Sequence, residues 1–170
     1  MTKGKSCLLL NLAIILLSAM TTIAAEPNSI GDIFKTGSFD WLFGKWEATN
    51  DANQKIEAEF ESEAGGYALS IETKTEKNEH AGLAYYSPAK KTILYTGVDN
   101  AGRVYTGQLE IQDDKLVFAL ERTNPDGSTI TFVRYLSKSD GNTMKSVTYN
   151  IVDGKRSDEP VNTLEFKREK

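Results

Sequence analysis

The chain has 170 residues, of which 20 are lysine or arginine and 24 are aspartate or glutamate, and its formal net charge is −4. An acidic chain with interspersed charges repels nucleic acid and anionic lipid, so we expect neither as a partner. Its only cysteine, Cys7, excludes an intrachain disulfide. The length suits a single domain with a sizeable core.

Residues 1–25 have the pattern of a secretory signal peptide. Two lysines precede an apolar run at residues 7–17, and residues 18–25 are rich in small side chains. The apolar run has roughly ten residues, whereas a membrane-spanning helix needs about 20, so cleavage is favoured over a retained anchor. We therefore expect a periplasmic or secreted protein that starts near Glu26, lacks cysteine and has no stable membrane insertion.

Residues 26–37 form a lead-in to the main domain, which we place at residues 38–170. A short helix is expected at residues 30–36, where the side chain of Ser29 is suited to cap the first turn. This helix is positioned to lie across one end of the domain.

A compact aromatic cluster, Phe39-Asp40-Trp41-Leu42-Phe43-Gly44-Lys45-Trp46, opens the main domain. Large aromatic side chains dominate the packing of a small core. We therefore assign Trp41 and Trp46 to a structural plug that seals one end, with Gly44 allowing close approach of the backbone.

Beyond this cluster, apolar residues recur at every second position, which puts them on one face of a strand. Examples are Ile56, Ala58 and Phe60, followed later in the chain by Leu116, Phe118 and Leu120. Turn signals such as Asp126-Gly127 and Asp153-Gly154 separate these segments and favour tight hairpins. The pattern predicts an all-β domain, a single antiparallel up-and-down β-barrel of about eight to ten strands. A β-sandwich obeys the same alternation and is the structural alternative.

The segment Trp41-Leu42-Phe43-Gly44-Lys45-Trp46 resembles the Gly-x-Trp signature of lipocalins and their calycin relatives, and most of all the bacterial barrels that open with aromatic-Leu-x-Gly-x-Trp. The run Gly82-Leu83-Ala84-Tyr85-Tyr86-Ser87-Pro88 and the strand containing Phe132-Val133-Arg134 also resemble that group. The resemblance covers roughly residues 38–168. It implies a calycin-type barrel that binds a small molecule.

Arg134 is the sharpest candidate for a ligand contact. It has the same strand parity as Phe132 and Leu136, and if that face points inward a guanidinium lies inside the barrel. Such a group is suited to the carboxylate of a fatty-acid-like ligand. The opposite parity, with Val133 and Tyr135 inward, makes Arg134 an exposed strand residue.

Tyrosines are spread over several expected strands, and those that point inward would line a cavity with apolar faces and a few hydroxyl groups. The candidates are Tyr85, Tyr95, Tyr105 and Tyr149. Each also fits a purely structural role, because tyrosine is a good strand former.

No metal site, cofactor or catalytic residue is indicated by a motif. The only histidine, His80, lies in the polar segment Lys77-Asn78-Glu79-His80, which favours an exposed position. A lone histidine without cysteines cannot form a usual zinc site. Nucleophile elbows, phosphate loops and calcium-loop spacings are absent from the sequence.

Three classes of function remain. The leading one is an exported soluble barrel that binds a small apolar or amphipathic ligand. The second is a secreted protein–protein interaction or inhibitor module with a filled barrel. The third is an enzyme, such as an isomerase or cyclase, that uses polar groups inside a barrel pocket. A hollow interior with a few polar groups distinguishes the first and third classes from the second.

Overall fold

A computed structural model describes residues 29–169, and the signal peptide expected at residues 1–25 lies outside this range. The elements, in chain order, are α1 (Ile30–Thr36), the 3-10 turn η1 (Asp40–Leu42), β1 (Gly44–Thr49), β2 (Lys55–Glu63), the 3-10 turn η2 (Ala64–Gly66), β3 (Ala68–Lys74), β4 (Glu79–Ser87), β5 (Thr92–Asp99), β6 (Val104–Gln112), β7 (Lys115–Thr123), β8 (Thr129–Asp140), β9 (Thr143–Val152), β10 (Lys155–Arg156) and β11 (Asn162–Arg168).

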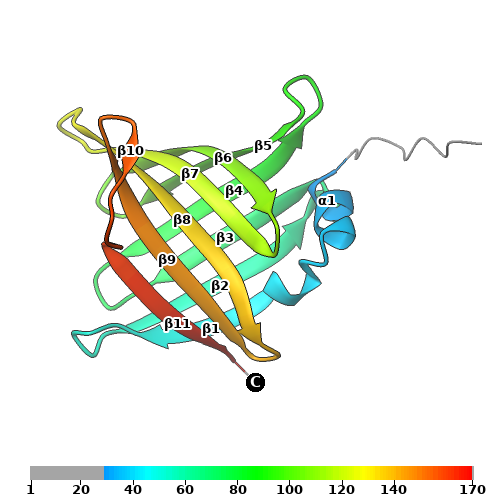
Figure 1. Ribbon diagram of the computed structural model, residues 1–170, viewed down its shortest axis with the longest axis horizontal. Coiled ribbons are helices and arrows are strands. Elements are labelled where there is room, and N and C mark those ends of the chain that lie inside the picture. The colour runs from blue at the N-terminus through cyan, green and yellow to red at the C-terminus, as the bar shows by residue number, and fades with distance from the viewer. Residues whose placement is uncertain (1–28, 170) are drawn as a thin grey trace, which may run out of the picture.

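The strands form one sheet that closes on itself (Figure 1). Each strand from β1 to β9 pairs antiparallel with the next, β9 also pairs with β11, and β11 pairs with β1. The two-residue β10 extends the pairing along the end of β9. The closed sheet is therefore a ten-stranded antiparallel barrel, which confirms the predicted up-and-down architecture and rules out the sandwich.

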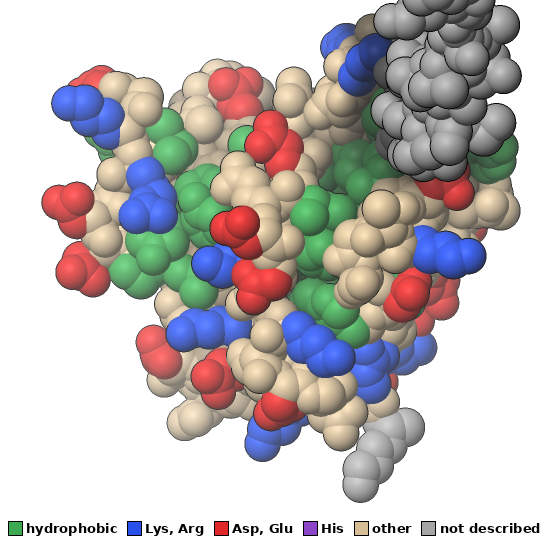
Figure 2. Space-filling model, turned by 45° about the vertical axis from the view of Figure 1, so that its right-hand side comes forward, with side chains coloured by type: hydrophobic (Ala, Val, Ile, Leu, Met, Phe, Trp, Pro, Cys, Tyr) green, Lys and Arg blue, Asp and Glu red, His purple; other side chains and the backbone are tan. Residues whose placement is uncertain are grey.

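Strand parity separates the inside of the barrel from the outside. In β1, Trp46 and Ala48 point inward and are buried, whereas Lys45 points outward and is exposed. Charged residues on the outside pair across strands, as in the 3.4 Å contact between Lys45 Nζ and Glu59 Oε1. Figure 2 shows such an outer surface, on which acidic and basic side chains are mixed with hydrophobic ones. The alternation of the sequence thus becomes a solvated wall around an apolar core.

The helix α1 covers one end of the barrel (Figure 1). The Ser29 side chain accepts a hydrogen bond from the Asp32 backbone N–H at 3.1 Å, which caps the first turn, as the sequence predicted. Ile30 and Phe34 on the inner side of α1 are 2% and 1% exposed and join the core of the barrel. This end of the barrel is therefore closed.

The aromatic cluster at residues 39–46 helps α1 to cover the same end of the barrel. Trp46 is 1% exposed, and its indole N–H donates to the Leu42 carbonyl oxygen at 2.8 Å. Trp41 meets the Trp46 ring edge-on, with ring centroids 6.2 Å apart. Gly44 adopts φ = 108°, a backbone conformation that favours glycine. The chain can therefore turn sharply from η1 into β1 beneath these rings.

The opposite end of the barrel is surrounded by the connections at residues 50–54, 75–78, 100–103, 124–128 and 153–161. At Asp153 and Gly154 the backbone has φ angles of 51° and 72°, which suit a tight two-residue hairpin turn. We refer to this end as the open end. None of the helices in residues 29–169 combines the length and apolar character required to cross a membrane.

Candidate functional site

The barrel encloses a cavity of about 440 Å³ that extends to the open-end connections at residues 75–78 and 100–103. Its apolar wall comes from several strands and includes Phe60, Ile71, Phe118, Leu120, Phe132 and Phe166. The polar groups of the wall include His80, Tyr95, Asp99, Tyr105 and Arg134. Pockets for small molecules have volumes of about 300–1,000 Å³. This cavity lies within that range, and polar and apolar side chains are about equally represented in its wall.

Arg134 lies on the inner side of β8 and lines the cavity. Its Nε donates to Thr148 Oγ1 on β9 at 3.2 Å, and its guanidinium lies 5.8 Å from the centroid of the Phe132 ring. Among residues 29–169, none of the ion pairs with a carboxylate involves Arg134. Burial lowers the pKa of Arg134, but a guanidinium stays protonated in proteins. The cavity therefore contains a cation without a protein counter-ion.

His80 and Tyr95 form a hydrogen-bonded pair in the same cavity. His80 Nε2 and Tyr95 Oη are 2.5 Å apart. Burial, and then the positive charge of Arg134, lower the pKa of His80, so its imidazole is held neutral. Burial raises the pKa of Tyr95, so its hydroxyl stays protonated. Both residues therefore present neutral polar groups.

Two glycines make room for the Tyr95 ring. A Cβ atom at Gly97 would lie 2.9 Å from Tyr95 Oη and 2.7 Å from His80 Cε1, and a Cβ atom at Gly82 would overlap the Tyr95 hydroxyl. Gly82 and Gly97 face each other in the register of β4 and β5. A side chain at either position would displace Tyr95 and disturb its hydrogen bond to His80.

Asp99 organises the open side of the cavity. Its Oδ2 accepts from the Tyr105 hydroxyl at 2.9 Å and from Arg103 Nε at 2.6 Å. Burial alone would raise the pKa of the Asp99 carboxyl, but hydrogen bonds from the Arg103 backbone and from Tyr105 hold it below its ordinary value. The charge of this buried carboxylate is therefore already balanced by Arg103.

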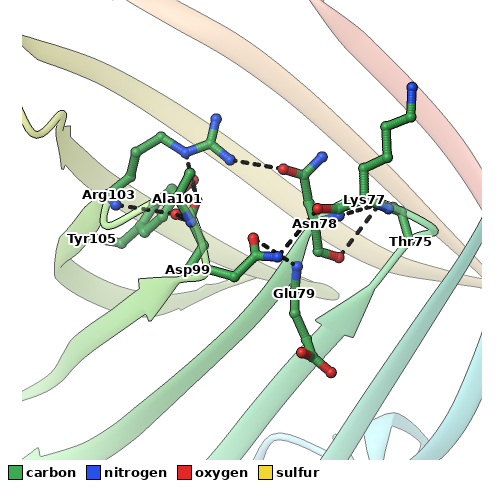
Figure 3. A network of polar contacts seen from close by, with 9 residues as sticks. Thr75, Lys77, Asn78, Glu79, Asp99, Ala101, Arg103 and Tyr105 are labelled. Atoms are coloured by element: carbon green, nitrogen blue, oxygen red, sulfur yellow. Dashed lines mark hydrogen bonds and ion pairs between the residues drawn. The ribbon is translucent and has the colours of Figure 1, made fainter.

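The same network fixes part of the rim (Figure 3). Arg103 Nη2 donates to Asn78 Oδ1 at 3.3 Å, which links the β5–β6 and β3–β4 connections. Asn100 adds two further bonds, because its Nδ2 donates to the Lys77 carbonyl at 3.1 Å and its Oδ1 accepts from the Glu79 backbone N–H at 3.2 Å. These contacts hold one side of the opening in place.

The structure brings three of the five candidate binding residues of the sequence to the cavity: Arg134, Tyr95 and Tyr105. Tyr85 lies on the outer face of β4 and is 40% exposed. Tyr149 lies on the outer face of β9, where its ring packs against Tyr135 and under the Arg156 guanidinium. Both follow from strand parity, since the inner positions of β4 and β9 are taken by Ala84 and Thr148, and neither belongs to the candidate site.

The expectation that His80 is exposed is wrong. The strand β4 begins at Glu79, so His80 is its first inner residue and not part of the turn. Its parity with Gly82 and Ala84 was the available signal. Asp99, at the end of β5, was also missed, because Asp99-Asn100-Ala101-Gly102 has the composition of an ordinary turn.

A second hollow, of about 650 Å³, borders the outer sides of β1 to β5. Glutamates outnumber lysines in its wall, and the two lysines pair with glutamates: Lys45 with Glu59 at 3.4 Å and Lys74 with Glu79 at 3.2 Å. Because most of these charged side chains are exposed to solvent, the internal cavity is the stronger candidate. No group of three or more His, Cys, Asp or Glu side chains in residues 29–169 is placed to hold a metal ion.

No protein-family model matches the chain, and no curated protein matches it. Among solved structures, the chain is similar to EF1p2_mFAP2b bound to DFHBI, with 14% sequence identity and a TM-score of 0.33. The match covers 79% of this chain and 98% of that one. With so low a TM-score, the candidate site is defined by the residues of this chain alone.

Proposed function

We propose that this protein is an exported carrier or sensor that binds a small amphipathic carboxylate inside its barrel, with Arg134 as the anchor of the carboxylate. The proposal is supported by the Arg134 guanidinium, which lines a cavity of mixed apolar, aromatic and polar side chains and has no carboxylate partner among the described residues. A buried charge is costly unless it is paired. A bound anion would supply the missing partner.

The geometry of Arg134 favours a planar carboxylate. Its Nε is engaged by Thr148, which leaves the two terminal nitrogens for a ligand. Two parallel N–H···O bonds from a guanidinium to a carboxylate are both strong and directional. Thr148 is itself 8% exposed and on the neighbouring strand, so it fixes the orientation of the fork.

The apolar wall supports an aliphatic or aromatic tail on the same ligand. Phe60, Phe118 and Phe166 lie in the wall and are each no more than 5% exposed. Burial of apolar surface contributes about 25 cal/mol per Å². A tail would therefore add affinity that an inorganic anion cannot obtain.

Export is part of the proposal and is supported by the composition of residues 1–25, with basic, apolar and small-residue segments in signal-peptide order. The alternative of a filled interaction module is disfavoured by the cavity. The enzyme alternative gains one observation, the short contact between His80 and Tyr95 within the cavity.

Calorimetric titration of decanoate and of decanol into residues 26–170 and into its Arg134→Met variant tests the proposal. Methionine keeps much of the apolar stem and removes the charge. Loss of a buried charge-assisted contact is expected to weaken decanoate binding by about 2–5 kcal/mol, which is roughly 30-fold or more in Kd. Decanol binding should change far less.

Arg156→Met is the matched control, because Arg156 is an exposed arginine on the outside of the barrel. It should leave both affinities unchanged. Equal losses for decanoate and decanol in Arg134→Met, or no binding of either ligand to the wild type, would contradict the proposal. Mass spectrometry of the protein purified from its native compartment would identify the natural ligand.

A further inference from the structure

Two buried side-chain atoms of the described residues have no hydrogen-bond partner, and each belongs to a residue that neighbours Tyr105. They are His80 Nδ1 and Arg122 Nε. The His80 ring meets the Tyr105 ring edge-on, with centroids 4.7 Å apart and an interplanar angle of 79°. Arg122 on β7 is the register partner of Tyr105 on β6. Buried polar groups normally have partners, so two unpaired polar atoms on residues next to one tyrosine of the cavity wall mark this part of the barrel for closer attention.

Arg122 belongs to the inner side of the barrel. It continues the alternation of Leu116, Phe118 and Leu120, which are all buried in the core. The residue is only half-buried and lies one step beyond Leu120 toward the open end. Arg122 is not among the residues that line the cavity, so a ligand that contacts it must extend beyond the cavity toward the open end.

Arg122, like Arg134, lacks a carboxylate partner among residues 29–169. Arg103 is different, because its Nε is bound to Asp99 at 2.6 Å. On the inner side of the open half of the barrel there are thus three arginines, Arg103, Arg122 and Arg134, and one buried carboxylate, that of Asp99, which pairs with Arg103. In a chain with more acidic than basic residues, this local excess of positive charge is the reverse of the overall balance.

We infer that Arg122 forms a second anion subsite at the open end, so that the ligand is a dianion with two carboxylate groups joined by an apolar spacer. This inference rests on the proposed function, in which Arg134 holds the first carboxylate. Phe118 lies opposite Arg134 in the register of β7 and β8, and Arg122 follows four residues later. At roughly 3.3 Å per residue, the two levels are about 13 Å apart.

A matched set of probes separates the two subsites. Decanedioate has a carboxylate at each end, 10-hydroxydecanoate replaces one carboxylate with an alcohol, and decanoate lacks the second polar group. The wild type should bind decanedioate most tightly. Arg122→Met should weaken the binding of decanedioate by about ten-fold or more, because a hydrogen bond to a charged group is lost. The affinity for decanoate should change by less than about two-fold.

Three further variants test whether the effect is specific to the charge of Arg122. Arg134→Met should weaken the binding of all three acids, and the outer control Arg156→Met should leave all three affinities unchanged. Arg122→Lys keeps the positive charge and should retain part of the preference for decanedioate. Thermal melts of each variant establish that it is folded before titration.

A measurement on the wild type covers the case in which Arg122 variants do not fold. In NMR spectra of arginine side chains, the Arg122 Nε–H signal should shift with decanedioate and stay in place with 10-hydroxydecanoate. An equal shift of the signal with both ligands would overturn the second subsite and leave the role of Arg134 intact. An equal loss of affinity for all three acids in Arg122→Met would do the same. Absence of any decanoate binding would instead overturn the proposed function and this inference together.

Discussion

The Arg168 guanidinium lies over the indole ring of Trp46, with 4.3 Å between Cζ and the ring centroid. The same group donates to the Phe43 carbonyl at 2.6 Å and to the Trp41 carbonyl. Arg168 is at the end of β11, so the last strand of the barrel fastens the aromatic cluster that precedes the first. One side chain thus connects the strand that closes the barrel with the aromatic cluster that covers its end.

Arg168→Met is expected to destabilise the protein by about 2–3 kcal/mol, because hydrogen bonds from a charged group to two carbonyl oxygens are lost. Urea unfolding of the variant and the wild type gives the difference. The control is Arg156→Met, whose guanidinium lies 4.5 Å from the Tyr149 ring centroid on an exposed strand, and which should cost less than about 1 kcal/mol. Equal losses in the two variants would show that Arg168 is an ordinary surface arginine.

Trp46→Ala should cost about 3–5 kcal/mol, because the large side chain is 1% exposed and its removal leaves a cavity in the core. Trp46→Phe keeps part of the ring but loses the hydrogen bond to the Leu42 carbonyl, so an intermediate loss is expected. Denaturant melts of both variants provide the measurement. A loss below about 1 kcal/mol for the alanine variant would place Trp46 outside the packing that holds the plugged end.

The barrel could be predicted from sequence because period two is a local signal that repeats in nearly every strand. The side of Arg134 could not, because both faces of β8 are apolar: Phe132 and Leu136 lie inside, while Val133 is 9% exposed on the outside. Outer residues become buried when neighbouring strands carry large side chains such as Tyr149, the register partner of Val133. The alternation of residues along β8 therefore does not show which of its faces points into the barrel.

The remaining site residues needed the register between strands. His80 meets Asp99 across β4 and β5, and Gly82 meets Gly97 two positions further along. In the sequence these residues are separated by turns and resemble turn residues themselves. Arg168 is 125 positions from Phe43, and no local pattern connects the two. Long-range pairing therefore determined the parts of the site that the sequence did not predict.

Gly82→Ala should destabilise the protein by about 1–3 kcal/mol, because the new Cβ would overlap the Tyr95 hydroxyl and overpack the wall. In a Tyr95→Leu background the same change should cost much less, since the obstructing hydroxyl is gone. Thermal or urea melts of the four proteins form a double-mutant cycle. Gly141→Ala, where no atom lies within 4 Å of the new Cβ, should change stability by less than about 0.5 kcal/mol. Additive losses for Gly82 and Tyr95 would show that the two residues do not compete for space.

Protonation of His80 should make stability depend on pH. Burial, then Arg134 and Arg103, lower the pKa of His80 below its ordinary 6.5, while Asp99 partly opposes the shift. Tyr95 and Tyr105 are its other titratable neighbours, and they stay protonated in this range. Below about pH 6.5 the unfolded chain binds a proton that the folded protein does not, so stability is lost as the pH falls and levels off above that value.

Urea melts between pH 5 and pH 8 compare the wild type with His80→Gln, which cannot titrate there. The wild type should lose stability relative to the variant on acidification, by up to about 1.4 kcal/mol per pH unit for one proton. Since His80 is the only histidine, its ring signals in NMR titrations report the folded pKa directly. Arg134→Met removes one cause of the lowered pKa and should raise it toward 6.5, which narrows the pH range of the loss. Parallel curves for wild type and His80→Gln would mean that the imidazole has the same pKa in the folded and unfolded chain, and would remove His80 from the buried polar group of the cavity.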